Sequence, residues 1–337
     1  MKISNLFLIL AAFLLLSCER QGTPNQQNHP LTRYRLLEPE EAKKAVTTDN
    51  KEGFFEKVNL LELCVQLQIP LEGQDKTEIL EKYKKLLQDD IMEFSPSEKK
   101  LLNHRFKTAL DLCYQFHKNL KLPEIKLIKT KGAYYGNAVY YTRENCIIIP
   151  ESQLNEENKY LLKTLIHEIF HIYSRYNPDK RDALYAAIGY HKIQNPELSE
   201  FLKNRIILNP DGINIAYAIE VQDSSKRTFK AIPSIYYRFG NYKNIPLLAG
   251  FVFQLFEVVE KDGKWTVANK DVGYNEDNLS GYWEKIGRNT RYTIHPDEVL
   301  ADNFTFLMMK NEIGSEYRNL SEGGKELLKK IEEILKK

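Results

Sequence analysis

The chain has 337 residues, of which 42% are hydrophobic and 28% are charged. This composition is typical of a folded protein and excludes a disordered, collagen-like or disulfide-scaffold chain. Lysine and arginine total 48 against 46 aspartate and glutamate residues, so the formal net charge of +2 offers no basic surface for nucleic acid. We therefore expect no nucleic-acid partner, and either two domains or one domain with large additions.

The N-terminus has the pattern of an export signal. An apolar run extends from Ile3 to Leu16, which is shorter than the roughly 20 apolar residues that a membrane-spanning helix needs. Its Leu-Leu-Ser-Cys ending resembles a bacterial lipoprotein signal, which implies removal of residues 1–17 and a lipid on Cys18. The alternative is a plain cleaved signal with an incidental cysteine. We predict a lipid-anchored envelope protein, periplasmic or surface-exposed, with residues 18–33 as a flexible tether.

Helical periodicity dominates residues 34–120. Apolar residues recur there at three- and four-residue spacing, and Ser95, Pro96 and Glu98 form a helix start. Of the three cysteines beyond Cys18, two lie on these predicted helices and could pair, whereas Cys146 lies in a predicted strand. The sequence therefore predicts a helical N-terminal region.

The pattern changes after Pro123. Residues 125–128 and 138–149 are extended, residues 156–176 regain a helical period, and residues 182–290 are mainly strand-like. Within that β-rich stretch the candidate strands are 213–221, 228–239 and 248–259, followed by a hairpin turn at 261–264. Further helices begin at Pro296 and near Leu327. We predict an α+β fold with a helical region over 34–120 and a second domain over 121–337.

A metal-binding motif lies within the helix predicted over residues 156–176. His167 and His171 are four residues apart, so both imidazoles lie on one face of a helix and can reach one tetrahedral zinc ion. Glu168 lies between them, beside the position of a water bound to that ion. The alternative is two incidental histidines on a core or surface helix.

This His-Glu-x-x-His motif resembles the zincins, and the downstream sequence resembles the gluzincin branch. Ser174 and Asn177 stand where the metzincin branch has Gly and His, which excludes that branch. Gluzincins take a third ligand from Glu-x-x-x-Asp on a later helix. Here that resemblance implies Glu298 as the ligand and Asp302 as the acceptor that orients an imidazole. The alternative is a pair of ordinary acids near a helix N-terminus.

The resemblance also implies a zincin-like catalytic domain with a mixed sheet, over residues 121–337. The gap from His171 to Glu298 is 298 − 171 = 127 residues, so residues 182–290 would be a β-rich insertion that shapes the cleft. In thermolysin-like gluzincins an Asn-Ala pair on an edge strand holds the substrate backbone, and Asn137 and Ala138 match it here. The alternative is a turn that follows Gly136.

The activity implied by this resemblance is zinc-dependent hydrolysis of peptide bonds. His167, His171 and Glu298 would hold one zinc ion, and Glu168 would act as general base toward the zinc-bound water that attacks the carbonyl. Tyr292 and His295 are the candidates for stabilising the oxyanion. The expected partners are a peptide or protein substrate and, through the lipid on Cys18, the membrane. The alternatives are a catalytically silent surface protein that binds peptide or glycan, and a cell-wall amidase.

Overall fold

The computed structural model describes residues 33–337 except residues 134, 137, 246, 269–271 and 312–316. The described residues belong to one compact unit that spans Thr32–Lys337. The predicted signal peptide and Cys18 lie outside the described residues. In the described part of the chain, no helix has both the length and the apolar character needed to span a bilayer.

The unit combines helices and strands throughout its length. The helices are α1 (Pro39–Val46), α2 (Phe54–Lys57), α3 (Leu60–Leu67), α4 (Lys76–Asp89), α5 (Pro96–Phe116), α6 (Leu161–Tyr176), α7 (Pro178–Ala187), α8 (Glu200–Lys203), α9 (Tyr282–Ile286), α10 (Pro296–Met308) and α12 (Glu322–Lys336). The strands are β1 (Tyr34–Leu36), β2 (Ile91–Met92), β3 (Ile125–Thr130), β4 (Tyr141–Arg143), β5 (Cys146–Pro150), β6 (Tyr190–Lys192), β7 (Ile206–Ile207), β8 (Tyr217–Gln222), β9 (Thr228–Tyr237), β10 (Phe251–Lys261) and β11 (Lys264–Val267). The predicted α+β class is confirmed.

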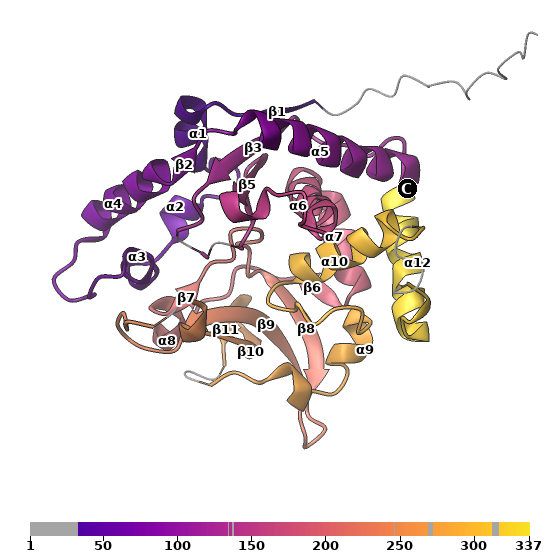
Figure 1. Cartoon of the computed structure of the whole chain (residues 1–337). Helices are drawn as coiled ribbons and strands as arrows, with labels where there is room; N and C mark the ends of the chain where they lie inside the picture. Colours follow the sequence, from indigo (N-terminus) through magenta and orange to yellow (C-terminus); the bar gives the residue numbers. More distant parts are fainter. Residues whose placement is uncertain (1–32, 134, 137, 246, 269–271, 312–316) are drawn as a thin grey trace, which may run out of the picture. The chain divides into compact units, whose positions relative to one another are not determined.

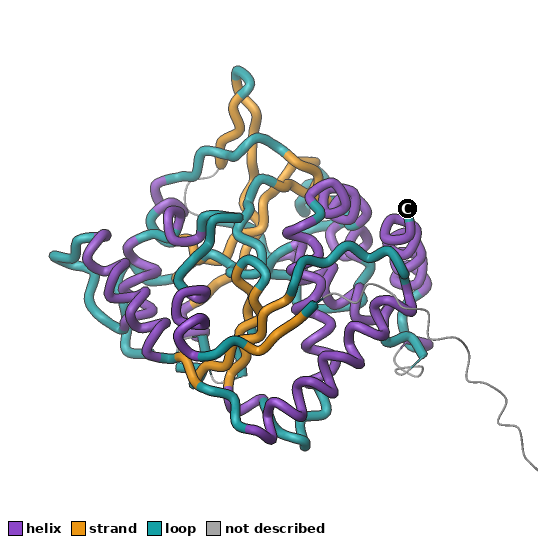
Figure 2. Tube along the Cα trace, turned by 90° about the horizontal axis from the view of Figure 1, so that it is seen from above, coloured by secondary structure: helices purple, strands orange, loops and turns teal. Residues whose placement is uncertain are grey.

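The first sheet is mixed and has the order β1-β3-β5-β4, with β2 paired to β3. Strands β1, β3 and β5 are parallel, whereas β2 and β4 run antiparallel to their neighbours. Both faces of the sheet are buried, because Ile147 and Ile149 of β5 pack into one hydrophobic cluster and Ile148 packs into another. Figure 2 shows the strands running through the middle of the unit with helices on either side.

The second sheet is formed by the predicted β-rich stretch. Its order is β11-β10-β9-β8-β6, with β7 paired to β9, and its pairs are antiparallel. A two-residue turn joins β10 to β11, and its residues Asp262 and Gly263 have φ of 51° and 73°. Positive φ at both central residues matches the right-handed twist of a hairpin, as expected from the Asp-Gly sequence. The short helices α7, α8 and α9 accompany these strands, and the sequence patterns did not predict them.

Helices α5, α6 and α10 pack beside one another (Figure 1). The rings of Phe170 in α6 and Phe304 in α10 have centroids 5.3 Å apart. Helix α6 begins at Leu161 rather than near residue 156. The reason is local, because the Asn158 side chain accepts a hydrogen bond from the backbone N–H of Tyr160 at 3.0 Å and donates one to Gln153, which holds a turn before the helix.

The N-terminal helical region is part of the same unit as the rest. Its strands β1 and β2 both pair with β3, so the domain boundary predicted near residue 120 falls inside one unit. Hydrogen bonding to β3 is what joins these segments, and the sequence pattern of short strands carries little signal of it. Cys64, Cys113 and Cys146 are free and buried, and the first two lie in separate hydrophobic clusters.

Candidate metal centre

Helices α6 and α10 bring the three predicted ligands together. The Nε2 atom of His167 lies 3.0 Å from Oε2 of Glu298, and the Nε2 atom of His171 lies 3.4 Å from the same oxygen. Four ligands around zinc at bond lengths of about 2.0–2.1 Å are separated by about 3.3 Å in a tetrahedron. The two distances to Glu298 are therefore close to the separation of ligands in a tetrahedral zinc site, and the three donor atoms all lie within 4.8 Å of one another.

Each imidazole is oriented by a carboxylate on its other nitrogen. Nδ1 of His167 lies 3.0 Å from Oδ1 of Asp302, and Nδ1 of His171 lies 2.8 Å from Oδ2 of Asp297. Because an ionised carboxylate can only accept, both Nδ1 atoms donate, so an imidazole in its neutral form carries its lone pair on Nε2, the nitrogen that would bind a metal. Without a metal, burial lowers the pKa of His167, but the hydrogen bonds to Asp302 and Glu298 outweigh it and raise the pKa to about 10. The predicted contact between Asp302 and His167 is present.

The second carboxylate, Asp297, was not predicted. Its Oδ1 atom accepts hydrogen bonds from Ser174 at 2.5 Å and Tyr185 at 2.8 Å, and the residue is buried. Burial raises the pKa of Asp297, but the hydrogen bond and charge of His171 outweigh it, so the pKa lies below its usual value. The sequence offered one signal for this contact. Asp297 directly precedes Glu298, and the first turn of α10 places its carboxylate near His171.

Glu298 is held by a loop from the β-rich stretch. The side-chain amide of Asn209 donates to Oε1 of Glu298 at 2.6 Å, which leaves Oε2 directed at the two histidines. Asn209 lies in the segment that follows β7. The sequence Asn-Pro-Asp-Gly over residues 209–212 signals only a turn, so no pattern in the sequence pointed to this contact.

Glu168 is buried beside the ligands. It is 4% exposed, and its Oε2 atom has no hydrogen-bond partner among the described residues. Burial, followed by the charge of Asp211, raises the pKa of Glu168 to about 8. Nε2 of His171 also has no hydrogen-bond partner there, although it is buried. A cation bound between the three donors would satisfy that nitrogen, so the residues present fit a zinc ion.

His295 is a helix cap rather than an oxyanion donor, which corrects the expectation from the sequence. Its Nδ1 accepts from the backbone N–H of Asp297 at 3.1 Å, and its Nε2 donates to the carbonyl of Asn214 at 3.2 Å. Both ring nitrogens are therefore engaged. The ring also packs on Gly212, where a Cβ atom would lie 2.4 Å from it, so the loop can approach only because that residue is glycine.

Tyr292 lies at the exposed side of the site. The residue is 45% exposed, and its ring stacks on that of His167 with centroids 6.1 Å apart and planes inclined by 28°. His167 is 13% exposed through its side chain, whereas those of His171 and Glu298 are 1% exposed. The open side of the centre is therefore at Tyr292.

Ala138, the described member of the predicted substrate-binding pair, is not on a strand. Asn137 lies outside the described residues, and Ala138 lies in an exposed turn in which the N–H of Val139 donates to Gly136 at 3.1 Å. The edge strand β4 begins only at Tyr141, because Gly136 has φ of 124° and turns the chain before it. The edge N–H of Thr142 donates to Asp211 at 2.5 Å, so it is not free to bind a peptide.

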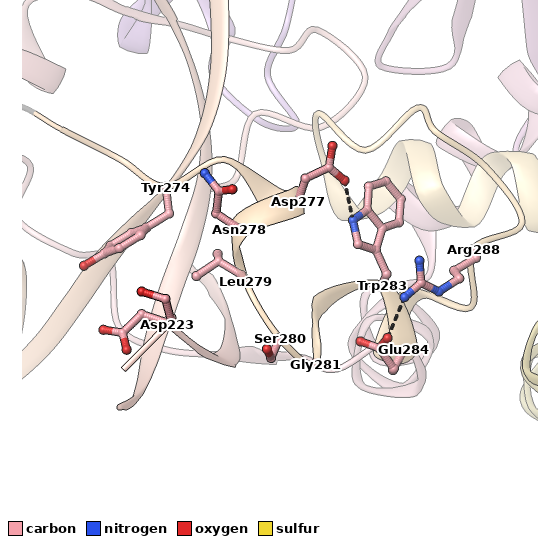
Figure 3. Close-up of a pocket in the computed structure, with 11 residues that line it drawn as sticks. Asp223, Tyr274, Asp277, Asn278, Leu279, Ser280, Gly281, Trp283, Glu284 and Arg288 are labelled. Atoms are coloured by element: carbon pink, nitrogen blue, oxygen red, sulfur yellow. Dashed lines mark hydrogen bonds and ion pairs between the residues drawn. The ribbon is translucent and has the colours of Figure 1, made fainter. Parts of the chain in front are cut away.

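A separate pocket lies among the β8–β9 turn, η3 (Glu276–Asn278) and α9, and none of the predicted site residues lines it (Figure 3). Its volume is about 880 Å³. The polar wall is paired internally, because Trp283 donates from Nε1 to Asp277 at 2.8 Å and Arg288 donates to Glu284 at 2.5 Å. The residues that the sequence predicts for metal binding, and the predicted general base, lie on α6 and α10 instead.

Comparison with protein-family models, with curated proteins and with solved structures finds no match to this chain.

Proposed function

We propose that this protein has a zincin-like fold of the gluzincin type and hydrolyses peptide bonds with the help of one zinc ion. The observation that carries the proposal is the geometry of the three donors. Nε2 of His167 and Nε2 of His171 lie 3.0 and 3.4 Å from one oxygen of Glu298, beside the unpaired carboxylate oxygen of Glu168. A zinc ion bound there supplies Lewis-acid polarisation of a carbonyl and acidification of a water molecule.

The roles of the protein groups follow from their positions. Glu168 accepts a proton from the attacking water and passes it to the leaving nitrogen, while the electron pair of the C–N bond goes to that nitrogen. The products are a carboxylic acid and an amine, which together account for the atoms of the peptide and the water. Tyr292, on the exposed side of His167, is the hydroxyl donor that we assign to the oxyanion.

A catalytically silent binding protein is the less favoured reading. A structural zinc site has four protein ligands. Among the described residues, His167, His171 and Glu298 offer three donors here, and Glu168, close to His171, keeps one carboxylate oxygen without a hydrogen-bond partner. A buried carboxylate without a partner costs stability. The buried carboxylate of Glu168 is explained if Glu168 acts as a general base.

Zinc content tests the ligand set. We expect close to one zinc per molecule in the purified full chain, and a large loss in Glu298→Gln, which keeps the shape of the side chain but removes its charge. The exposed residue Glu284 gives the matched control Glu284→Gln, which should keep its zinc. Metal is measured by mass spectrometry after dialysis. Full zinc in Glu298→Gln would exclude Glu298 as a ligand.

Hydrolysis of unfolded casein tests the reaction in the same proteins. Glu168→Gln should keep its zinc and lose roughly 100- to 10,000-fold in turnover, as expected when a general base is removed. Cleavage of peptidoglycan fragments without cleavage of casein would identify the amidase alternative. Zinc-loaded wild-type protein that cleaves neither would support a binding role.

We also propose that the protein is anchored to a bacterial envelope by lipid on Cys18. This rests on the apolar run of residues 3–16 and on the Leu-Leu-Ser-Cys sequence that ends it. Mass spectrometry of the mature N-terminus tests the proposal. An unmodified terminus at or beyond Glu19 would rule it out.

A further inference from the structure

Asp211 is a buried carboxylate that has no role in the mechanism described so far. Its Oδ1 atom accepts hydrogen bonds from the backbone N–H and the hydroxyl of Thr142, at 2.5 and 2.7 Å. The guanidinium of Arg175 donates to the backbone carbonyls of Pro210 and Asp211, both at 3.2 Å. The carboxylate is therefore held in one place by contacts to its side chain and to its backbone.

The position of this carboxylate is close to the general base. One carboxylate oxygen of Asp211, one of Glu168 and a ring nitrogen of His171 all lie within 4.8 Å of one another. Asp211 does not belong to the group of donors formed by His167, His171 and Glu298. Two buried carboxylates this close repel each other unless a cationic or N–H group lies between them.

We propose that Asp211 is a further catalytic residue, which accepts a hydrogen bond from the amine nitrogen that leaves when the peptide bond breaks. The inference rests on the proposed peptidase function. Glu168 must come within about 2.6–3.2 Å of the nitrogen that it protonates. Since the two carboxylate oxygens are no more than 4.8 Å apart, a nitrogen at that distance from Glu168 can also reach Asp211.

The proton balance explains why a second carboxylate is useful there. The nitrogen of the tetrahedral intermediate has one N–H, and it gains a second hydrogen when Glu168 returns the proton that it took from water. The nitrogen is then positively charged, and it becomes a neutral amine only when it takes the electron pair of the C–N bond. Asp211, fixed before the reaction, stabilises that positive charge while Glu168 is neutral or has just released its proton.

The substitution Asp211→Asn tests the role in the full-length protein. The amide oxygen of asparagine can still accept from Thr142, so the loop keeps its contacts while the charge is lost. We expect unchanged zinc content and a peptide turnover lower by about 10- to 100-fold, the effect of one charge-assisted hydrogen bond. The leaving group of a matched ester substrate is an alcohol, which has no N–H group to donate to Asp211. The turnover of this ester should therefore fall less than about threefold, which is less than the loss of one hydrogen bond would cause. The control is Asp262→Asn, in an exposed turn.

A binding measurement tests the same inference without turnover. A product-like peptide with a free α-amine should bind the purified wild-type protein at least about 10-fold more tightly than its N-acetylated form, and Asp211→Asn should abolish the difference. Calorimetry gives both affinities. Equal affinity for the two peptides in the wild type, equal losses for ester and peptide, or loss of zinc in Asp211→Asn would each overturn the inference. A wild type that binds no zinc or hydrolyses nothing would instead defeat the proposed function, and the peptide affinities would still decide on Asp211.

Discussion

At the scale of single residues, the centre depends on groups that orient the ligands. A carboxylate lies on Nδ1 of each histidine, and the amide of Asn209 lies on the far oxygen of Glu298. Such contacts fix the tautomer and direction of a ligand before the metal arrives, and their loss weakens metal affinity or activity by 10- to 100-fold in known sites. We expect them to contribute to zinc affinity here.

Replacing Asp302 by asparagine tests this expectation. The carboxylate of Asp302 accepts from His167 and from the hydroxyl of Thr290. Burial raises the pKa of Asp302, but the hydrogen bond from His167 more than offsets it, so the carboxyl group is ionised at neutral pH. Asp302→Asn should weaken zinc binding by about 10- to 100-fold. Competition with a chromogenic chelator measures the affinity, and an unchanged value would show that His167 needs no such partner.

At the scale of elements, the centre is built on two rigid helices with matching periodicity. The histidines of α6 and the acids Glu298 and Asp302 of α10 are both spaced by four residues, so each pair lies on one helix face. Helix α6 packs between α5 and α10, which limits its movement. The precision of the donor set therefore depends on helix packing and not on loop conformation alone.

The start of α5 gives a test at this scale. Ser95 and Glu98 form a capping box, in which each side chain accepts from the backbone N–H of the other residue. Removing a serine cap costs about 1 kcal/mol. Ser95→Ala should lower the free energy of unfolding in urea by that amount, whereas Ser224→Ala, at an exposed position in the β8–β9 turn, should change it by less than about 0.5 kcal/mol. Equal changes in the free energy of unfolding in the two variants would show that the Ser95 cap does not stabilise α5.

At the scale of the whole unit, Arg175 joins parts of the chain that are far apart in sequence. It lies near the end of α6 and is buried, and all five of its N–H groups are used. The acceptors are Glu52 Oε2 at 2.8 Å, Thr142 Oγ1 at 3.0 Å, the Glu144 carbonyl at 2.9 Å, and the Pro210 and Asp211 carbonyls at 3.2 Å. One guanidinium thus ties the N-terminal region, the edge strand β4 and the loop after β7 to helix α6.

Loss of this guanidinium should destabilise the unit strongly. Removing one partner of a buried ion pair costs about 3–5 kcal/mol. Here Glu52 would keep only Arg181 among the described residues, at 3.6 Å, and the four other acceptors would lose their donor. We expect Arg175→Met to lower the free energy of unfolding by that amount. The surface pair Arg288 and Glu284 gives the control Arg288→Met, which should cost at most about 1 kcal/mol. Urea unfolding measures both, and similar values for the two variants would contradict the role of Arg175.

Local sequence patterns were sufficient to predict the features that depend on a single helix or a single turn. The spacing of His167 and His171 needs only a helix to place both rings on one face, and Asp262-Gly263 needs only its own backbone preferences to make a hairpin. The α+β class follows from the same periodicities. These features were predicted because their physical causes lie within a few residues of one another.

Tertiary structure decided the features that depend on contacts between distant segments. Asn209 and Asp211 reach the centre only because the loop after β7 is fixed by Arg175 and Thr142. His295 has two hydrogen-bond partners, of which Asn214 is 81 residues away. Sequence patterns report periodicity along one segment, whereas a hydrogen bond between two loops depends on how the chain folds back. The three candidate ligands could therefore be named from the sequence, while the residues that orient them were largely visible only in the folded chain.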